Sequence, residues 1–243
     1  MGVFEPENNP LWLARVYSQR GAVYRLQGEY DNAESDLLRS IEYNIPIEKP
    51  QAHHILGLVH WNRGDLQAAL KQFKISNRLA TDTNDAFTQI NNLVAYAEVH
   101  FLLWNTEKQP ALADKISSYA KTLEDLLAQG YDYPSHLGRM QRVLGDVAFS
   151  EKKYEKAMKI YASAYAELGK RSGGFGVRGF QDEINFLSEK IKTLSGENPQ
   201  EALQWCDYLL EYWSDEKLPL LRRDELVSLC ELKKIEIELG LLR

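Results

Sequence analysis

The sequence predicts an all-α protein built from consecutive pairs of helices. Apolar residues recur at helical spacing, and no stretch alternates apolar and polar residues beside a hairpin turn. Small residues on two antiparallel helices let the backbones approach closely, while larger side chains fill the flanks. In three stretches a glycine is followed twelve residues later by an alanine, in the same apolar frame: Gly21 and Ala33, Gly57 and Ala69, Gly145 and Ala157. Each stretch therefore predicts one tightly packed helix pair.

Proline and glycine divide the chain into eleven expected helices. Gly28 and Gly64 follow the first and third helices, where a chain favours a left-handed stop. Pro110 and Pro199 lie in the first turns of the sixth and tenth helices, where a missing N–H costs nothing. The expected spans are about 11–27, 31–44, 49–63, 66–80, 84–105, 109–129, 135–150, 154–170, 178–195, 199–213 and 219–240.

These helices group into one predicted domain over residues 1–243, with five repeat units and a terminal helix over 219–240. The units span about 11–45, 49–81, 84–129, 135–171 and 178–214. The small residues of their second helices are Ala33, Ala69, Ala113, Ala157 and Ala202. In units three and five, Phe101 and Lys190 stand where the other units have glycine.

The residues around the three glycines resemble the tetratricopeptide repeat pattern W-x2-L-G-x2-Y…A-x3-F, with substitutions at the aromatic places. The resemblance implies a right-handed α-solenoid of about five helix pairs plus a C-terminal helix, with first helices lining a concave surface. It also implies binding of a protein or peptide without catalysis. The alanines are farther apart than the standard ~34 residues. The chain is in this respect similar to the long-repeat sensor or scaffold regions of signal-transducing ATPases.

Composition restricts the function further. The net charge is −6, with 29 basic and 35 acidic residues, which argues against nucleic-acid binding. No apolar run approaches the ~20 residues of a membrane span, and the N-terminus has no secretory signal pattern. Cys206 and Cys230 lie in different predicted helices. They are expected to be buried reduced thiols of a cytoplasmic protein, with a disulfide as the alternative.

No combination of side chains indicates catalysis, a metal site or a cofactor. His53 and His60 are seven residues apart, too far for a compact pair of metal ligands on one helix. The glycine-rich segment 172–179 lacks the Gly-Lys-Ser/Thr ending of a phosphate-binding loop and follows a helix, so it is expected to be a linker, with a partner-binding loop or hinge as the alternative. We therefore expect a protein that is not an enzyme.

A partner-binding groove is the expected functional site, formed by inward-facing positions of the first helices. Arginine binds carboxylates through a bidentate fork, so four inward arginines predict an acidic partner, unless they are merely solvated helix charges. Trp61 and Phe149 would supply apolar contacts. The candidate residues are Arg15, Arg25, His54, Trp61, Asn91, Glu98, Arg139, Arg142, Asp146 and Phe149.

A second interpretation is a receptor for a small signalling peptide or metabolite. In that case Asn91 and Asn92 would bind the backbone of the ligand in a closed pocket. The C-terminal helix leaves another choice open, because its last turn is apolar. Either this helix caps unit five, or the chain is part of a larger polypeptide.

Overall fold

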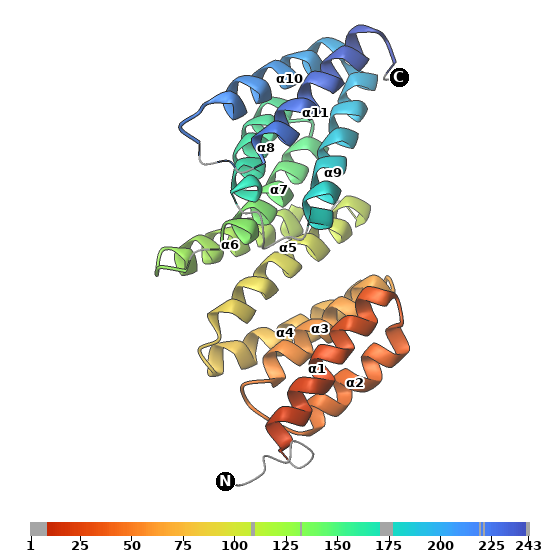
Figure 1. Cartoon of the computed structure of the whole chain (residues 1–243), viewed down its shortest axis with the longest axis vertical. Coiled ribbons are helices and arrows are strands. Elements are labelled where there is room, and N and C mark those ends of the chain that lie inside the picture. The colour runs from red at the N-terminus through yellow and green to blue at the C-terminus, as the bar shows by residue number, and fades with distance from the viewer. Residues whose placement is uncertain are drawn as a thin grey trace. The chain divides into compact units, whose positions relative to one another are not determined.

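A computed structural model gives the fold, and it describes residues 9–107, 110–131, 133–170, 177–218, 220 and 222–241. Within these ranges the fold is all-α, with eleven helices packed in consecutive pairs (Figure 1), which confirms the predicted fold class. The chain divides into two compact units, Met1–Gln129 and Gly130–Arg243. The boundary falls between predicted repeat units three and four. One continuous right-handed solenoid over residues 1–243 stays a prediction.

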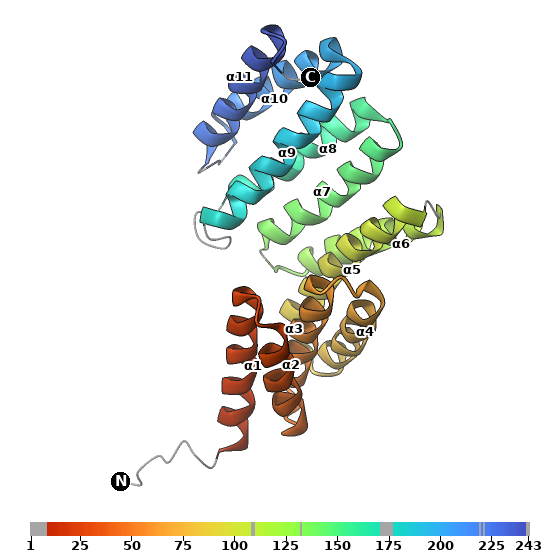
Figure 2. The ribbon, with the colours of Figure 1, turned by 90° about the vertical axis from the view of Figure 1, so that its right-hand side faces the viewer.

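The first unit contains three helix pairs, α1 with α2, α3 with α4, and α5 with α6. The first helices of consecutive pairs also contact one another, α1 with α3 and α3 with α5 (Figure 2). This is the arrangement that places one helix of every pair along a shared face. The helices are α1 (Pro10–Gln27), α2 (Tyr30–Glu42), α3 (Lys49–Asn62), α4 (Leu66–Asp82), α5 (Ala86–Glu107) and α6 (Pro110–Leu127).

The second unit contains α7 (Pro134–Ser150), α8 (Tyr154–Gly169), α9 (Val177–Glu197), α10 (Pro199–Ser214) and α11 (Arg223–Glu238). Helix α7 packs against α8, while α10 contacts α8, α9 and α11. Helix α11 begins at Arg223, later than the expected residue 219. The Arg223 guanidinium donates hydrogen bonds to the carbonyls of Trp213, Asp215 and Leu218, so it holds the preceding turn outside the helix.

The helix ends follow the expected turn chemistry. Gly28 and Gly64 adopt left-handed φ values of 81° and 86°, and the N–H of Gly28 donates to the Arg25 carbonyl. Asn9 and Asp65 cap α1 and α4 through their side-chain oxygens. Residues 171–176, which include most of the glycine-rich segment expected to be a linker, lie outside the described residues.

The glycine and alanine positions make the close contacts that the pattern predicts. A Cβ atom on Gly57 would lie 2.5 Å from the Cε1 atom of Phe73, and one on Gly145 would lie 2.6 Å from Cε1 of Tyr161. On the facing helices, Ala69 is fully buried. The aromatic residue four places after the alanine thus occupies the space that a side chain at the glycine position would need. In the first pair, Leu37 occupies this space opposite Gly21.

The first unit differs from the ideal repeat at its third helix pair, where the sequence pattern is weak. Ala113, expected to be the small residue of the third pair, is only partly buried. Leu112 and Ile116 supply the buried side chains of that part of α6 instead. Ala202, the corresponding residue of the fifth pair, is fully buried within the core of the second unit.

Candidate functional site

The predicted groove positions lie mainly between consecutive first helices. Three helix pairs of this kind are connected by polar contacts, α1 with α3, α3 with α5, and α7 with α9. A position that faces inward in an ideal repeat therefore has a neighbouring first helix at its side. Many of the predicted binding side chains consequently have a partner within the chain itself.

Arg15 and Arg25 connect α1 to α3. The Nη2 atom of Arg15 lies 2.5 Å from Oε1 of Glu48, the N-cap residue of α3, and the Arg15 side chain remains 46% exposed. Arg25 donates from Nη1 to Oδ1 of Asn62 at the other end of α3, over 3.1 Å. The two arginines therefore hold opposite ends of the same helix.

His54 is part of a buried polar chain between α3, α4 and α5. Its Nδ1 atom lies 2.8 Å from Oδ1 of Asn92, and the Asn92 amide donates to Oγ of Ser76 over 2.9 Å. Ser76 in turn donates to the carbonyl of Pro50 over 2.7 Å. Asn92 is fully buried and uses both amide atoms in this chain, so it has little capacity left for a ligand.

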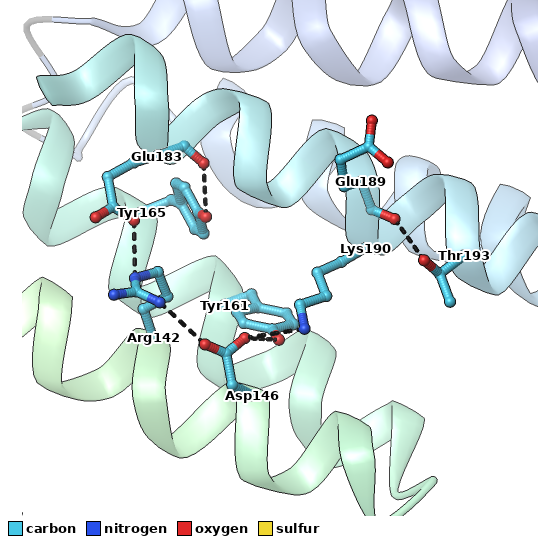
Figure 3. Close-up of polar contacts among 8 residues, drawn as sticks. All are labelled: Arg142, Asp146, Tyr161, Tyr165, Glu183, Glu189, Lys190 and Thr193. Atoms are coloured by element: carbon cyan, nitrogen blue, oxygen red, sulfur yellow. Dashed lines mark hydrogen bonds and ion pairs between the residues drawn. The ribbon is translucent and has the colours of Figure 1, made fainter. Parts of the chain in front are cut away.

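Arg142 and Asp146 belong to a charged cluster between α7 and α9, drawn in Figure 3. Arg142 lies 3.0 Å from Asp146 through Nη1 and 2.8 Å from Glu183 through Nε. Lys190 lies 3.6 Å from the other oxygen of Asp146, which also accepts a 2.6 Å hydrogen bond from Tyr161. Two cations face two carboxylates, so the cluster is balanced in charge and links the two helices.

Burial dominates the electrostatics of this cluster. Asp146 is fully buried, and desolvation raises its pKa, while Arg142, Lys190 and Tyr161 act in the opposite direction. The Lys190 ammonium also lies 5.0 Å from the ring centre of Phe149, and Arg142 lies 4.9 Å from that of Phe186. Phe149 is itself buried against Trp205, so this predicted apolar contact is a core residue.

The other predicted residues lie on α3, α5 and α7 without forming one cluster. Trp61 packs at the edge of the core around Phe73, partly exposed. The Asn91 amide donates to the Phe87 carbonyl, and Glu98 is buried. Arg139 is partly buried and, like Asn91 and Glu98, has interactions within the chain. Binding by these residues stays a prediction.

The partners Glu48, Glu183 and Lys190 were missed as members of the site. Glu48 caps α3, and Glu183 and Lys190 lie on α9, so each belongs to a first helix next to the one that carries its arginine or aspartate. The signal that could have found them is an opposite charge one repeat away at a facing position. The longer and unequal repeat spacing obscured this signal.

Arg25 differs from Arg15 and Arg142, which pair with carboxylates. Its Nε atom is buried and makes no hydrogen bond, and no carboxylate pairs with it among the described residues. Burial also lowers the pKa of Arg25. The Arg25 side chain is partly exposed, so an anionic group from outside could pair with the part of the guanidinium that remains accessible.

Two hollows lie on the surface of the units. One, of about 350 Å³, is lined by Tyr17, Arg39, Glu42 and Tyr43, and the other, of about 490 Å³, includes Tyr208 and Glu211 in its wall.

Across the described ranges, no three His, Cys, Asp or Glu side chains are grouped so that they could hold a metal ion. Cys206 and Cys230 are both buried and unbridged. No described helix is long and apolar enough to cross a membrane.

Comparison with known proteins supports the repeat assignment for part of the chain. No curated protein matches the sequence. A family model described as Tetratricopeptide repeat matches residues 14–76, which extend from α1 into α4. This range contains both Gly–Ala pairs of the first unit whose close packing is described above. Residues 14–76 are therefore similar to tetratricopeptide repeats, which are typical of protein–protein interaction modules.

Proposed function

We propose that this chain is a non-catalytic scaffold that binds an acidic segment of a partner protein along α1 and α3. The observation that carries the proposal is Arg25, a partly exposed guanidinium that donates to the neutral Asn62 amide and has no carboxylate partner among the described residues. An acidic side chain of the partner would supply that carboxylate. Guanidinium groups bind carboxylates strongly and with defined geometry, so Arg25 would give both affinity and orientation.

The charge of α1 supports the same partner chemistry. The helix contains three arginines and no acidic residue, although the whole chain has a net charge of −6. Arg15 is paired with Glu48 but keeps nearly half of its side chain exposed. An extended acidic segment that reaches Arg25 could therefore also interact with Arg15, while the uncharged surface around it contributes apolar contact.

Selection from a peptide library tests this function. The full chain is immobilised, and random peptides displayed on phage are selected for binding to it. We expect the enriched peptides to carry Asp or Glu at a recurrent position and to bind less well as salt increases, since exposed ion pairs are screened. Enriched peptides without acidic residues, or no enrichment at all, would contradict the proposal.

The wider role is part of the same proposal. By resemblance to long-repeat sensor and scaffold regions, the chain would act in the cytoplasm as a regulatory part of a signalling assembly. Its two buried, unbridged thiols are compatible with a reducing compartment. A copurification of the tagged chain from its native host, followed by identification of partners that carry acidic segments, would test this role.

A second candidate function is a receptor for a small peptide or metabolite, and it rests on the hollow beside α1 and α2. Tyr17 and Tyr43 stack there with ring centres 6.0 Å apart, next to Arg39 and Glu42. A small ligand bound there should raise the melting temperature of the parent but not of Tyr17→Ala. A ligand effect that survives this substitution would remove the candidate.

A further inference from the structure

The outer face of α1 carries an exposed apolar stripe. Trp12, Val16, Val23 and Leu26 are 44%, 51%, 51% and 74% exposed. Their spacing, completed by Gln19, repeats every three and four residues, so these side chains share one face of the helix. The buried residues of α1, such as Ala14 and Gly21, lie on the opposite face. In the first unit, the stripe is therefore not covered by α2 or α3.

A second stripe of the same kind lies on α11. Leu232, Ile235 and Leu239 are 53%, 52% and 67% exposed, again at spacings of three and four residues. The buried side of this helix, with Leu226 and Cys230, faces the core of the second unit. The terminal helices of repeat proteins normally present a polar outer face, because an apolar one exposes surface that a further repeat would bury.

The charges around the two stripes are complementary. Helix α1 contains arginines and no acidic residue, and the Arg20 side chain is 49% exposed although it pairs with Asp36. Helix α11 contains five acidic and three basic residues. Three of the acidic residues, Asp224, Glu231 and Glu238, are exposed and recur every seven residues beside the apolar stripe. The apolar stripe of α1 thus lies on a basic helix, and the apolar stripe of α11 lies beside an acidic row.

We propose that the outer face of α1 binds the outer face of α11 from a second copy of this chain. The interface joins two different surfaces, so it is head-to-tail, and a pair of copies retains one free α1 face and one free α11 face. The chain then assembles into an open row or a closed ring, depending on the rotation between neighbours. Two copies of α1 facing each other would instead pair two helices that contain arginines and no acidic residue, and two copies of α11 would bring their acidic rows together.

Mixing two interface variants tests the head-to-tail geometry. Val16→Glu with Val23→Glu removes the α1 stripe, and Leu232→Glu with Ile235→Glu removes the α11 stripe. Each double variant alone should be monomeric by light scattering after size exclusion, because neither can find an intact partner face. An equimolar mixture should form a 1:1 dimer and nothing larger, since each variant contributes the face that the other lacks.

The parent chain and a matched control complete the experiment. Parent protein should form concentration-dependent oligomers, and so should Leu38→Glu with Ile47→Glu, which places the same charges at exposed apolar positions elsewhere. Circular dichroism should show that all variants keep the parent's helix content, because the replaced side chains lie outside the cores. A parent that stays monomeric at millimolar concentration, or variants that do not dimerise on mixing, would overturn the proposal.

Discussion

Replacing Gly145 by alanine should destabilise the second unit, because the new methyl group has no space. Its Cβ would lie 2.6 Å from Cε1 and 2.8 Å from Cδ1 of Tyr161, far inside normal contact distance. Tyr161 cannot easily move aside. Its hydroxyl donates to Asp146 over 2.6 Å, and its ring packs against Trp205 with centres 6.0 Å apart. The strain therefore falls on the whole α7–α8 contact.

The size of the effect follows from two opposing contributions. Overpacking a well-filled core costs ~1–3 kcal/mol, and the higher helix propensity of alanine returns up to ~1 kcal/mol. We expect a net loss of up to ~2 kcal/mol in the free energy of unfolding. Gly196→Ala is the matched control, because no heavy atom lies within 4 Å of its added Cβ. The free energy of unfolding of that variant should rise by a few tenths of a kcal/mol, up to ~1 kcal/mol.

Urea denaturation followed by circular dichroism and tryptophan fluorescence measures both variants against the parent. The expected result is a clear separation, with Gly145→Ala unfolding at lower urea and Gly196→Ala at equal or higher urea. Gly57→Ala should behave like Gly145→Ala but lose less, because no hydrogen bond holds the facing Phe73 ring. If Gly145→Ala and Gly196→Ala were equally stable, the close packing of the fourth helix pair would be refuted.

Two further predictions concern charged and titratable groups. Arg142→Met should lower the free energy of unfolding, measured by urea titration, by ~3 kcal/mol, because it leaves Asp146 fully buried without its closest cation. Adding Asp146→Asn should recover part of the loss. Additive losses would mean that the pair is not coupled. Burial lowers the pKa of His53 and of His100 in the folded chain. The unfolded chain then binds more protons than the folded chain. The free energy of unfolding therefore has its full value above pH ~6.5 and falls as the pH drops through the folded pKa values. Melting curves from pH 7.5 to 5 should show this fall, and His53→Gln with His100→Gln should flatten it; an unchanged slope would exclude these histidines as the cause.

The fold was predictable because local signals agreed with the packing. Gly28 and Gly64 end helices as the turn chemistry requires, and Gly57 packs under an aromatic ring as the repeat pattern predicts. The prediction was weaker where the pattern was incomplete. Ala113 was expected to be the small residue of its pair, but a single alanine at helical spacing does not show which side of α6 faces the core.

The site was less predictable, since the pattern gives a direction for a side chain but not its neighbour. Arg142 was predicted to face a binding groove from α7, and in the structure Glu183 lies beside it on α9 and pairs with it. Phe149 was expected to contact a partner and is instead buried against Trp205. Whether a groove position binds a ligand or the next helix depends on inter-helix distances that a single repeat does not encode.

A binding titration tests the central claim, recognition of an acidic segment through Arg25, most directly. A fluorescent peptide obtained by selection on the parent chain is titrated with parent, Arg25→Gln and Arg78→Gln, and anisotropy gives the dissociation constants. Arg78 is an exposed arginine on α4 and serves as the matched control. The account predicts at least tenfold weaker binding for Arg25→Gln, about 1.4 kcal/mol, and no change for Arg78→Gln. Equal binding by all three proteins would contradict it.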